Sequence, residues 1–342
     1  MLFHRASGLE GLLRGCLEVH GSSVRIVDAH RLREQRLDAL LYNALFQPEE
    51  KVRYFLCWLI RQAAAGNAIH PASLGGLYAK VARGQAPKFT IPTISLHAMP
   101  YWAGRSVFRA MREVGCGAVA LSLDGSAESA PSPLEYATCL LAAAMREGYE
   151  GPVFLEADFL CADSDQTGLI QELLEGAINA GFFNVLLDPR RLEDLTHPDP
   201  SAQVEASYTF CAALASFVRQ IEPQGVGSAI SIRFGLGDAN TALRLRAFVE
   251  GFDREFVRRA GHVPGISRFD LNVRSELDLD AAVELAEVAR REYLLPTGVD
   301  LPGTSFADEW LEALVNMPFA QVHLGDWLKA RVSAILGQGG IK

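Results

Sequence analysis

The chain has 342 residues, and its 32 Lys and Arg against 41 Asp and Glu give a formal net charge of −9. Hydrophobic residues make up 49% and charged residues 21%, a composition typical of globular proteins that excludes a disordered or collagen-like chain. The acidic balance and the lack of a Lys/Arg-rich run argue against nucleic acid as a partner.

The sequence also carries no membrane signal. No apolar run reaches the roughly 18 residues that a spanning helix needs. The first 15 residues lack the charged start, apolar middle and small-residue cleavage site of a signal peptide. We therefore expect a cytoplasmic protein with no membrane partner.

Residues 1–88 are predicted to form a helical N-terminal extension. Apolar residues recur at helical spacing over 31–46. Pro48 opens a second helical segment that stops at Gly66, and Pro71 opens a third. No strand pattern stands out in this range.

Residues 89–342 are predicted to form a (β/α)8 TIM barrel. Short β-rich runs alternate with helical patterns eight times, which favours parallel βα units. The predicted strands are 89–97, 117–123, 152–159, 184–188, 229–234, 268–273, 297–301 and 320–324. The length of the region suits the roughly 250 residues of this fold. An open doubly wound sheet is the alternative, but no G-x-G-x-x-G follows any predicted strand.

Several of the predicted strands carry polar residues at or near their C-terminal ends. Barrel enzymes place their chemistry at the C-terminal ends of the strands, where alternate residues share a face. The residues in that register are Ser95, His97, Asp124, Glu156, Asp158, Asp188, Arg233, Asp270, Asn272, Arg274, Asp300 and His323. Their convergence predicts a polar pocket. The alternative is that they form buried ion pairs that close the barrel.

Each of these residue types suggests a role. Two carboxylates two residues apart, Glu156 and Asp158, can have their pKa values driven apart, so that one acts as acid and the other as base. His97 and His323 are candidate proton carriers near neutral pH. An arginine can hold a carboxylate or phosphate through two hydrogen bonds. The candidates for binding the substrate from this set are Ser95, Asp124, Arg233, Asp270, Asn272, Arg274 and Asp300.

Several segments spread along the chain support a family resemblance. They are 69–99, 140–159, 182–195, 245–252, 266–271, 288–293 and 320–326. In these segments the sequence resembles the zinc-dependent class II aldolases of the fructose/tagatose-bisphosphate type, in particular their longer bacterial homologues with a helical N-terminal extension. The resemblance implies a barrel of carbon–carbon lyase lineage, with Asp158 as its acid/base. It also implies part of a phosphate cradle at Gly303 and Ser305.

The zinc ligands of that family are missing from this chain. Phe159, Leu277 and Leu301 stand where the resemblance would place the three histidines. Zinc needs several N, S or deprotonated O ligands around one point, so we expect no zinc, no cofactor and no zinc-dependent activity. A hard metal held by oxygen ligands at the carboxylate-rich rim is an alternative.

Two functions of different classes fit these residues. One is a metal-independent lyase, isomerase or dehydratase acting on a small anionic sugar- or keto-acid-like substrate, with Asp158 as acid/base. The other is a non-catalytic aldolase-like subunit or small-molecule binding protein. An ordinary ketose-bisphosphate aldolase is a lesser alternative. The expected partners are a small anionic or phosphorylated metabolite and either a further copy of the chain, in a homo-oligomer, or an aldolase-like partner subunit.

Overall fold

The computed structural model describes residues 2–3, 6–85, 90–96, 98–124, 131–161, 164–236, 240–273, 277–301 and 319–323. The chain forms two compact units. The first comprises Met1–Ala72, Leu96–Ala118 and Ser129–Val153, and the second comprises Ser73–Ser95, Val119–Glu128 and Phe154–Lys342. Among the described residues, no helix is both long and apolar enough to cross a bilayer.

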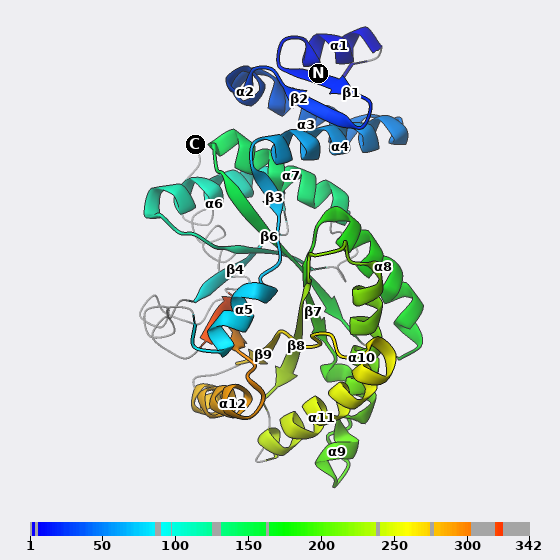
Figure 1. Cartoon of the computed structure of the whole chain (residues 1–342), viewed down its shortest axis with the longest axis vertical. Helices are drawn as coiled ribbons and strands as arrows, with labels where there is room; N and C mark the ends of the chain where they lie inside the picture. The colour runs from blue at the N-terminus through cyan, green and yellow to red at the C-terminus, as the bar shows by residue number, and fades with distance from the viewer. Residues whose placement is uncertain are drawn as a thin grey trace, which may run out of the picture. The chain divides into compact units, whose positions relative to one another are not determined.

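Eight parallel strands close into a barrel, which confirms the predicted (β/α)8 fold (Figure 1). In chain order they are β4 (Ile91–Ser95), β5 (Ala120–Asp124), β6 (Gly151–Leu160), β7 (Asn184–Asp188), β8 (Ala229–Gly235), β9 (Arg268–Asn272), β10 (Thr297–Asp300) and β11 (Phe319–His323). Each strand pairs with the next, and β11 pairs with β4 to close the ring. All eight predicted strands overlap these ranges.

Helices separate the strands along the chain. They are α6 (Pro100–Val114), α7 (Pro133–Glu147), α8 (Thr167–Ala180), α10 (Glu205–Ile221), α11 (Thr241–Ala260) and α12 (Leu277–Tyr293). A short α5 (Gly75–Ala82) precedes β4, and α9 (Pro200–Gln203) precedes α10. Helix α7 shows why the sequence sets these limits. The Ser132 hydroxyl and the Glu135 carboxylate form a capping box at its start, and Gly148 ends it with a φ of 64°.

The N-terminal part of the chain, up to Ala72, is more mixed than the sequence indicated. It contains α1 (Ala6–Leu13), α2 (Ala29–Arg31), a π-helical turn (Leu32–Arg36), α3 (Leu37–Phe46) and α4 (Glu50–Gly66). The predicted helices over 31–46 and 48–66 are confirmed by α3 and α4. However, the structure adds an antiparallel hairpin of β1 (Leu17–His20) and β2 (Ser23–Ile26), and β3 (Ile69–Pro71) pairs with the start of β6. These strands of three or four residues are too short to show a clear period in the sequence.

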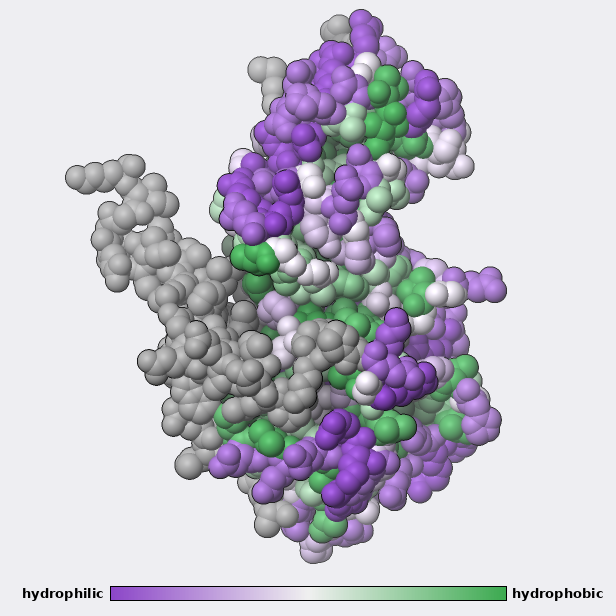
Figure 2. Space-filling model, turned by 60° about the vertical axis from the view of Figure 1, so that its left-hand side comes forward, coloured by the Kyte–Doolittle hydropathy of each residue, from purple (hydrophilic) through white to green (hydrophobic). Residues whose placement is uncertain are grey.

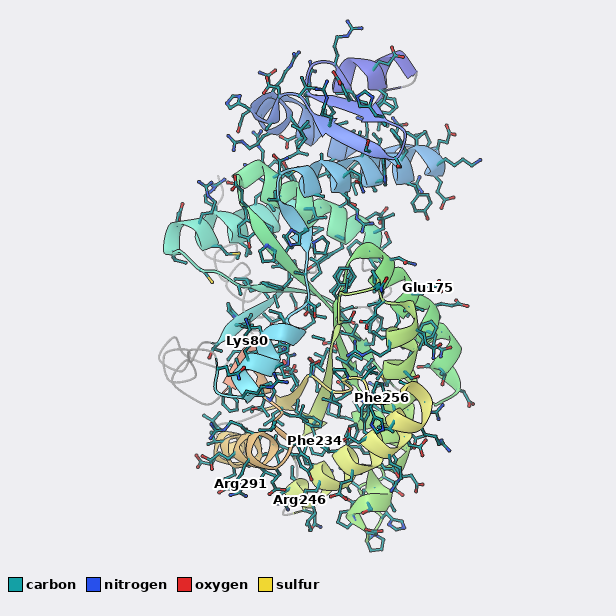
Figure 3. All side chains as sticks on the ribbon, in the orientation of Figure 1. Lys80, Glu175, Phe234, Arg246, Phe256 and Arg291 are labelled. Atoms are coloured by element: carbon teal, nitrogen blue, oxygen red, sulfur yellow. The ribbon has the colours of Figure 1, made fainter. Side chains whose placement is uncertain are left out.

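A cluster of phenylalanines packs α11 against the barrel wall. Its members are Phe234 of β8, Phe269 of β9, and Phe248, Phe252 and Phe256, which recur every four residues on α11 (Figure 3 labels Phe234 and Phe256). Phe248 stacks on Phe252 with ring centroids 6.3 Å apart. It meets Phe234 and Phe269 edge-on at 6.1 and 5.9 Å. Burying each ring contributes about 1.5–3 kcal/mol, so the cluster fixes the strands that carry part of the site described next.

The outer surface mixes polar and apolar residues. Figure 2 shows hydrophilic residues interspersed with hydrophobic ones over the face turned to the viewer. Exposed large hydrophobic residues such as Leu169, Leu243 and Val257 come from the outer faces of α8 and α11. Single apolar residues of this kind are normal on the surface of a folded protein and indicate no binding site.

Candidate functional site

A polar cavity of about 480 Å³ opens at the C-terminal ends of β5 to β8, within the second unit. It is lined by Asp124, Asp158, Leu160, Asp188, Arg190, Arg191 and Arg233. The strand register brings these residues together, because Asp124 of β5 lies opposite Asp158 of β6, and Leu160 of β6 lies opposite Asp188 of β7. Three acids and three arginines therefore share one cavity wall.

Arg233 is the central cation of the site. It lies on β8 with its side chain about nine-tenths buried. Its Nη1 atom is 2.9 Å from Asp158 and 3.5 Å from Asp188. Its Nε atom is 3.3 Å from Asp300, and Nη2 is 4.0 Å from Asp270. Burial would lower the pKa of this guanidinium, but the four carboxylates together raise it. The charge is stable inside the barrel because it has these partners.

Asp158 is the carboxylate best placed for proton transfer. Its side chain is 22% exposed and lines the cavity. Burial, together with the nearby charges of Asp300 and Asp188, raises its pKa to about 6 against the opposing charges of Arg233 and His323. A carboxyl group with this pKa is present in both protonation states near neutral pH, as a general acid or base requires.

The arginines after β7 differ in their availability. Both lie in the 3-10 turn Arg190–Leu192. Arg190 donates two hydrogen bonds to Asp188, at 2.8 and 2.6 Å. Burial alone would raise the pKa of Asp188, but the hydrogen bonds from Arg190 hold it below its usual value. Arg191 is exposed and forms no ion pair with the described residues. Arg191 thus differs from Arg190 in having no carboxylate partner among the described residues.

A second charged network lies deeper in the barrel. The Nε2 atom of His323 is 2.7 Å from Asp270 and 3.5 Å from Glu156. The Nη2 atom of Arg268 is 3.2 Å from Asp270 and 3.3 Å from Glu156. Burial would raise the pKa of Asp270, but Arg268 and His323 lower it. Burial alone would lower the pKa of His323. The charges of Asp270 and Glu156 outweigh burial, so the pKa of His323 is raised.

Three residues that the sequence did not single out complete this network. Arg268 donates a hydrogen bond of 2.6 Å to the Tyr78 hydroxyl, which in turn bonds to Gln321. Gln321 also donates to Glu156 at 3.2 Å. Gln321 and Arg268 each lie two residues before a predicted site residue on the same strand, so alternation in the strand could have found them. Tyr78 lies on α5, and no strand pattern points to it.

The structure brings most of the predicted site residues together. Those in the two charged networks or the cavity wall are Asp124, Glu156, Asp158, Arg233, Asp270, Asp300 and His323. Asn272 donates a 3.2 Å hydrogen bond to Asp300. Glu156 and Asp158 contact different arginines, Arg268 and Arg233, rather than sharing one.

Other predicted residues fall outside this arrangement. Ser95 ends β4 opposite Ser122 and does not line the described cavity. His97, Arg274, Gly303 and Ser305 lie outside the described residues. Arg190 and Arg191 were missed because they follow a strand instead of ending it, although two arginines directly after Asp188 and Pro189 were a usable signal. In the described part of the chain, no group of three or more His, Cys, Asp or Glu has the geometry of a metal site.

A larger cavity of about 580 Å³ lies at the other end of the barrel, before β8, β9 and β10. Apolar residues such as Val263, Ile266 and Leu295 make up much of its lining. Arg219 and Glu222, which also line it, form an ion pair with each other at 2.9 Å, so their charges offset one another. The perturbed carboxylates lie at the C-terminal end, where barrels place their chemistry.

No family model and no curated protein sequence matches the chain. Similar solved structures include a Burkholderia cenocepacia protein described as a phosphonomutase (15% identity, 77% of this chain and 97% of the other, TM-score 0.48). They also include 2,3-dimethylmalate lyase, a PEP mutase/isocitrate lyase superfamily member (13%, 79% and 89%, 0.46), and phosphonopyruvate hydrolase (13%, 79% and 89%, 0.44).

These comparisons correct one expectation. The resemblance to class II aldolases is wrong: the similar solved structures named above are a phosphonomutase, a 2,3-dimethylmalate lyase of the PEP mutase/isocitrate lyase superfamily and a phosphonopyruvate hydrolase, and none of these is a class II aldolase. Two alternative functions, an aldolase-like subunit and an ordinary ketose-bisphosphate aldolase, depended on that resemblance and are no longer supported. At these identities the likeness concerns the fold alone.

Proposed function

We propose that the chain is a metal-independent acid/base enzyme that acts on a small anionic substrate, with Asp158 moving the proton. The observation that carries this proposal is the position of Asp158 in the cavity wall with a pKa raised to about 6. A carboxyl group that is held only to stabilise the fold is normally ionised at neutral pH, whereas this one can both accept and donate a proton there.

The proton step uses groups that are already in place. Deprotonated Asp158 takes a proton from a substrate carbon next to a carbonyl or carboxylate, so that a C–H bond breaks and an O–H bond forms. The electron pair stays on the substrate as an enolate. Arg233, 2.9 Å from Asp158, lies where its charge stabilises that negative oxygen. Reprotonation at another atom, or cleavage of the next bond, then gives an isomerase or a lyase.

The cavity wall accounts for the anionic substrate class. Arg191 offers a guanidinium that no described carboxylate occupies, and a guanidinium matches a carboxylate or a phosphate in geometry. Asp124 and Asp188 on the same wall can accept hydrogen bonds from substrate hydroxyl groups. This combination favours a hydroxylated or oxo-substituted acid over a bare hydrocarbon acid.

Arg233 also supports a metal-independent reaction. A cluster of carboxylates commonly needs a cation at its centre, and here the guanidinium of Arg233 lies within 4.0 Å of four of them. It is delocalised and always charged, so it can stabilise negative charge on a bound substrate throughout the neutral pH range.

Deuterium exchange provides a test that works whatever the product is. The protein is incubated in D₂O with a panel of small 2-oxo acids, 2-hydroxy acids and sugar phosphates, and the loss of substrate C–H signals is followed by ¹H NMR. We expect exchange in at least one compound and a loss of at least about 100-fold in Asp158→Asn, in line with the usual worth of a general base.

The control is Glu175→Gln, which removes an exposed acid on α8 that does not line the cavity (Figure 3). It should leave the exchange rate unchanged. Exchange that survives in Asp158→Asn contradicts the proposal. Saturable binding of a panel member without exchange or turnover would instead identify a binding protein.

A further inference from the structure

Gly298 lies where any side chain would collide with a charged group of the site. It is on β10, directly opposite Asp270 of β9 in the strand register. A Cβ atom at Gly298 would be 2.3 Å from Oδ1 of Asp270, and 3.2 Å from the backbone oxygen of Gln321. Carbon and oxygen atoms that are not bonded do not approach to 2.3 Å, so the Asp270 carboxylate occupies the space of the missing side chain.

The Asp270 carboxylate depends on this space for its position. It is fully buried, and it is held by His323 at 2.7 Å, by Arg268 at 3.2 Å and by Arg233 at 4.0 Å. A side chain at position 298 would take the space of its Oδ1 atom and push the carboxylate out of these contacts.

We infer that Gly298 is a positioning residue of the site, which leaves room for the Asp270 carboxylate between Arg233 and His323 and thereby fixes the charges that surround Asp158. This inference rests on the proposed function, in which Asp158 moves the proton. Gly298 does not touch the substrate or the reacting atoms, and it acts through Asp270.

Charged groups from several strands and one turn face this part of the barrel. They are Asp124 of β5, Glu156 and Asp158 of β6, Asp188 of β7, Arg190 and Arg191 of the following turn, Arg233 of β8, Arg268 and Asp270 of β9, Asp300 of β10 and His323 of β11. Of these described acids, only Asp270 contacts Arg233 as well as both cations of the deeper network, Arg268 and His323. Moving it therefore changes the partners of Arg233 and His323 together.

The direction of the effect on Asp158 follows from these contacts. Asp270 raises the pKa of His323, so displacing it favours the neutral imidazole. Arg233 also loses one of its carboxylate partners and is less firmly held beside Asp158. Arg233 and His323 are the two groups that lower the pKa of Asp158. Weakening both therefore raises the pKa of Asp158 from its value of about 6.

The test compares Gly298→Ala with Gly235→Ala by NMR titration of the full chain. Gly235 is a matched control because it ends β8 in the same barrel, and a Cβ there would meet its nearest atom, Cδ of Arg190, at an ordinary 3.6 Å. In Gly298→Ala we expect the His323 imidazole midpoint to fall and the Asp158 carboxyl midpoint to rise, each by about one pH unit. Gly235→Ala should shift neither. Wild-type midpoints in Gly298→Ala overturn the inference.

A stability cycle covers the case in which Gly298→Ala weakens the fold. We expect Gly298→Ala to lower Tm clearly in the wild-type background, and much less in Asp270→Ala, where the colliding carboxylate is gone. Equal losses in both backgrounds overturn the inference. Neither experiment needs turnover, so a wild-type protein that fails to exchange deuterium would remove the proposed function and leave this test of Gly298 intact.

Discussion

The Nη1 atom of Arg233 lies 2.9 Å from Oδ2 of Asp158, and the same nitrogen is 3.5 Å from Asp188. One guanidinium thus joins the ends of β6, β7 and β8 at the cavity wall. The pKa of Asp158 is nevertheless raised to about 6, because burial and the neighbouring acids raise it more than the charge of Arg233 lowers it. This balance makes the pair the centre of the account, and several outcomes depend on it.

The rate of proton abstraction should rise with pH through the pKa of Asp158. The reacting form is the carboxylate, so kcat/KM for deuterium exchange should increase about tenfold per pH unit below about 6 and level off above it. A pH–rate profile from mildly acidic to mildly alkaline pH measures this. A rate that is flat across the range, or that breaks near the ordinary aspartate value of about 4, would assign the base to another group.

Replacing Arg233 by methionine should strongly destabilise the protein. The change keeps much of the side-chain volume but leaves Asp158, Asp188, Asp270 and Asp300 without their shared cation, and breaking a buried pair in this way costs about 3–5 kcal/mol. Urea unfolding at mildly alkaline pH gives the loss. Arg246→Met removes an ion pair with Glu292 on the helix surface and should have little effect (Figure 3). Equal losses of unfolding free energy in the two variants would show that the ion pairs of Arg233 contribute no more to stability than a surface ion pair.

Arg191 should contribute to substrate binding and little to stability. Arg191→Gln removes an exposed guanidinium with no described ion pair, so Tm should stay within about 1 °C of the wild type. The KM of an anionic substrate should rise about 10- to 100-fold, the worth of one charge-assisted contact. Arg291→Gln, an exposed position on α12, serves as the control (Figure 3). An unchanged KM would place the substrate anion elsewhere.

Chelators and added divalent ions should leave the activity unchanged. Arg233 supplies the cation among the strand-end carboxylates, so treatment with EDTA followed by Mg²⁺, Mn²⁺ or Zn²⁺ should alter the exchange rate less than about twofold. Metal analysis of the dialysed protein accompanies the assay. If a metal restored activity after chelation, the metal and not Arg233 would be the cation that stabilises the reacting substrate.

His323 should stabilise the fold at acid rather than at alkaline pH. Its pKa is raised in the folded chain, so its contribution is fully present below the unfolded value of about 6.5 and is lost as the pH rises through the folded value. The difference in unfolding free energy between wild type and His323→Gln should therefore be larger at about pH 6 than at about pH 9. A difference that is constant with pH would mean that the imidazole stays neutral in the barrel.

The sequence predicted the barrel and much of the site for one physical reason. Alternation along a strand places every second residue inside, so polar residues at strand ends, such as Asp158 and Arg233, are visible as a pattern. Arg190 and Arg191 were invisible to this rule because they follow β7. Tyr78 was also missed, because its partners Arg268 and Gln321 lie 190 and 243 residues away in the chain.

The family resemblance failed for a related reason. Segments such as 140–159 combine an apolar helix with a buried strand, a pattern that barrels of parallel βα units share because helices cover their strands. Local similarity of that kind reports the fold and not the chemistry. The short hairpin of β1 and β2 shows the same limit at smaller scale, since strands of four residues cannot reveal a period.

The most direct measurement is the titration of the Asp158 carboxyl group itself. ¹³C NMR of the protein labelled at its aspartate carboxyl carbons, with Asp158→Asn to assign the signal, gives its midpoint without any substrate. We expect a midpoint of about 6. A midpoint at or below about 4, the ordinary value for aspartate, would show a permanently ionised partner of Arg233 and contradict the central claim.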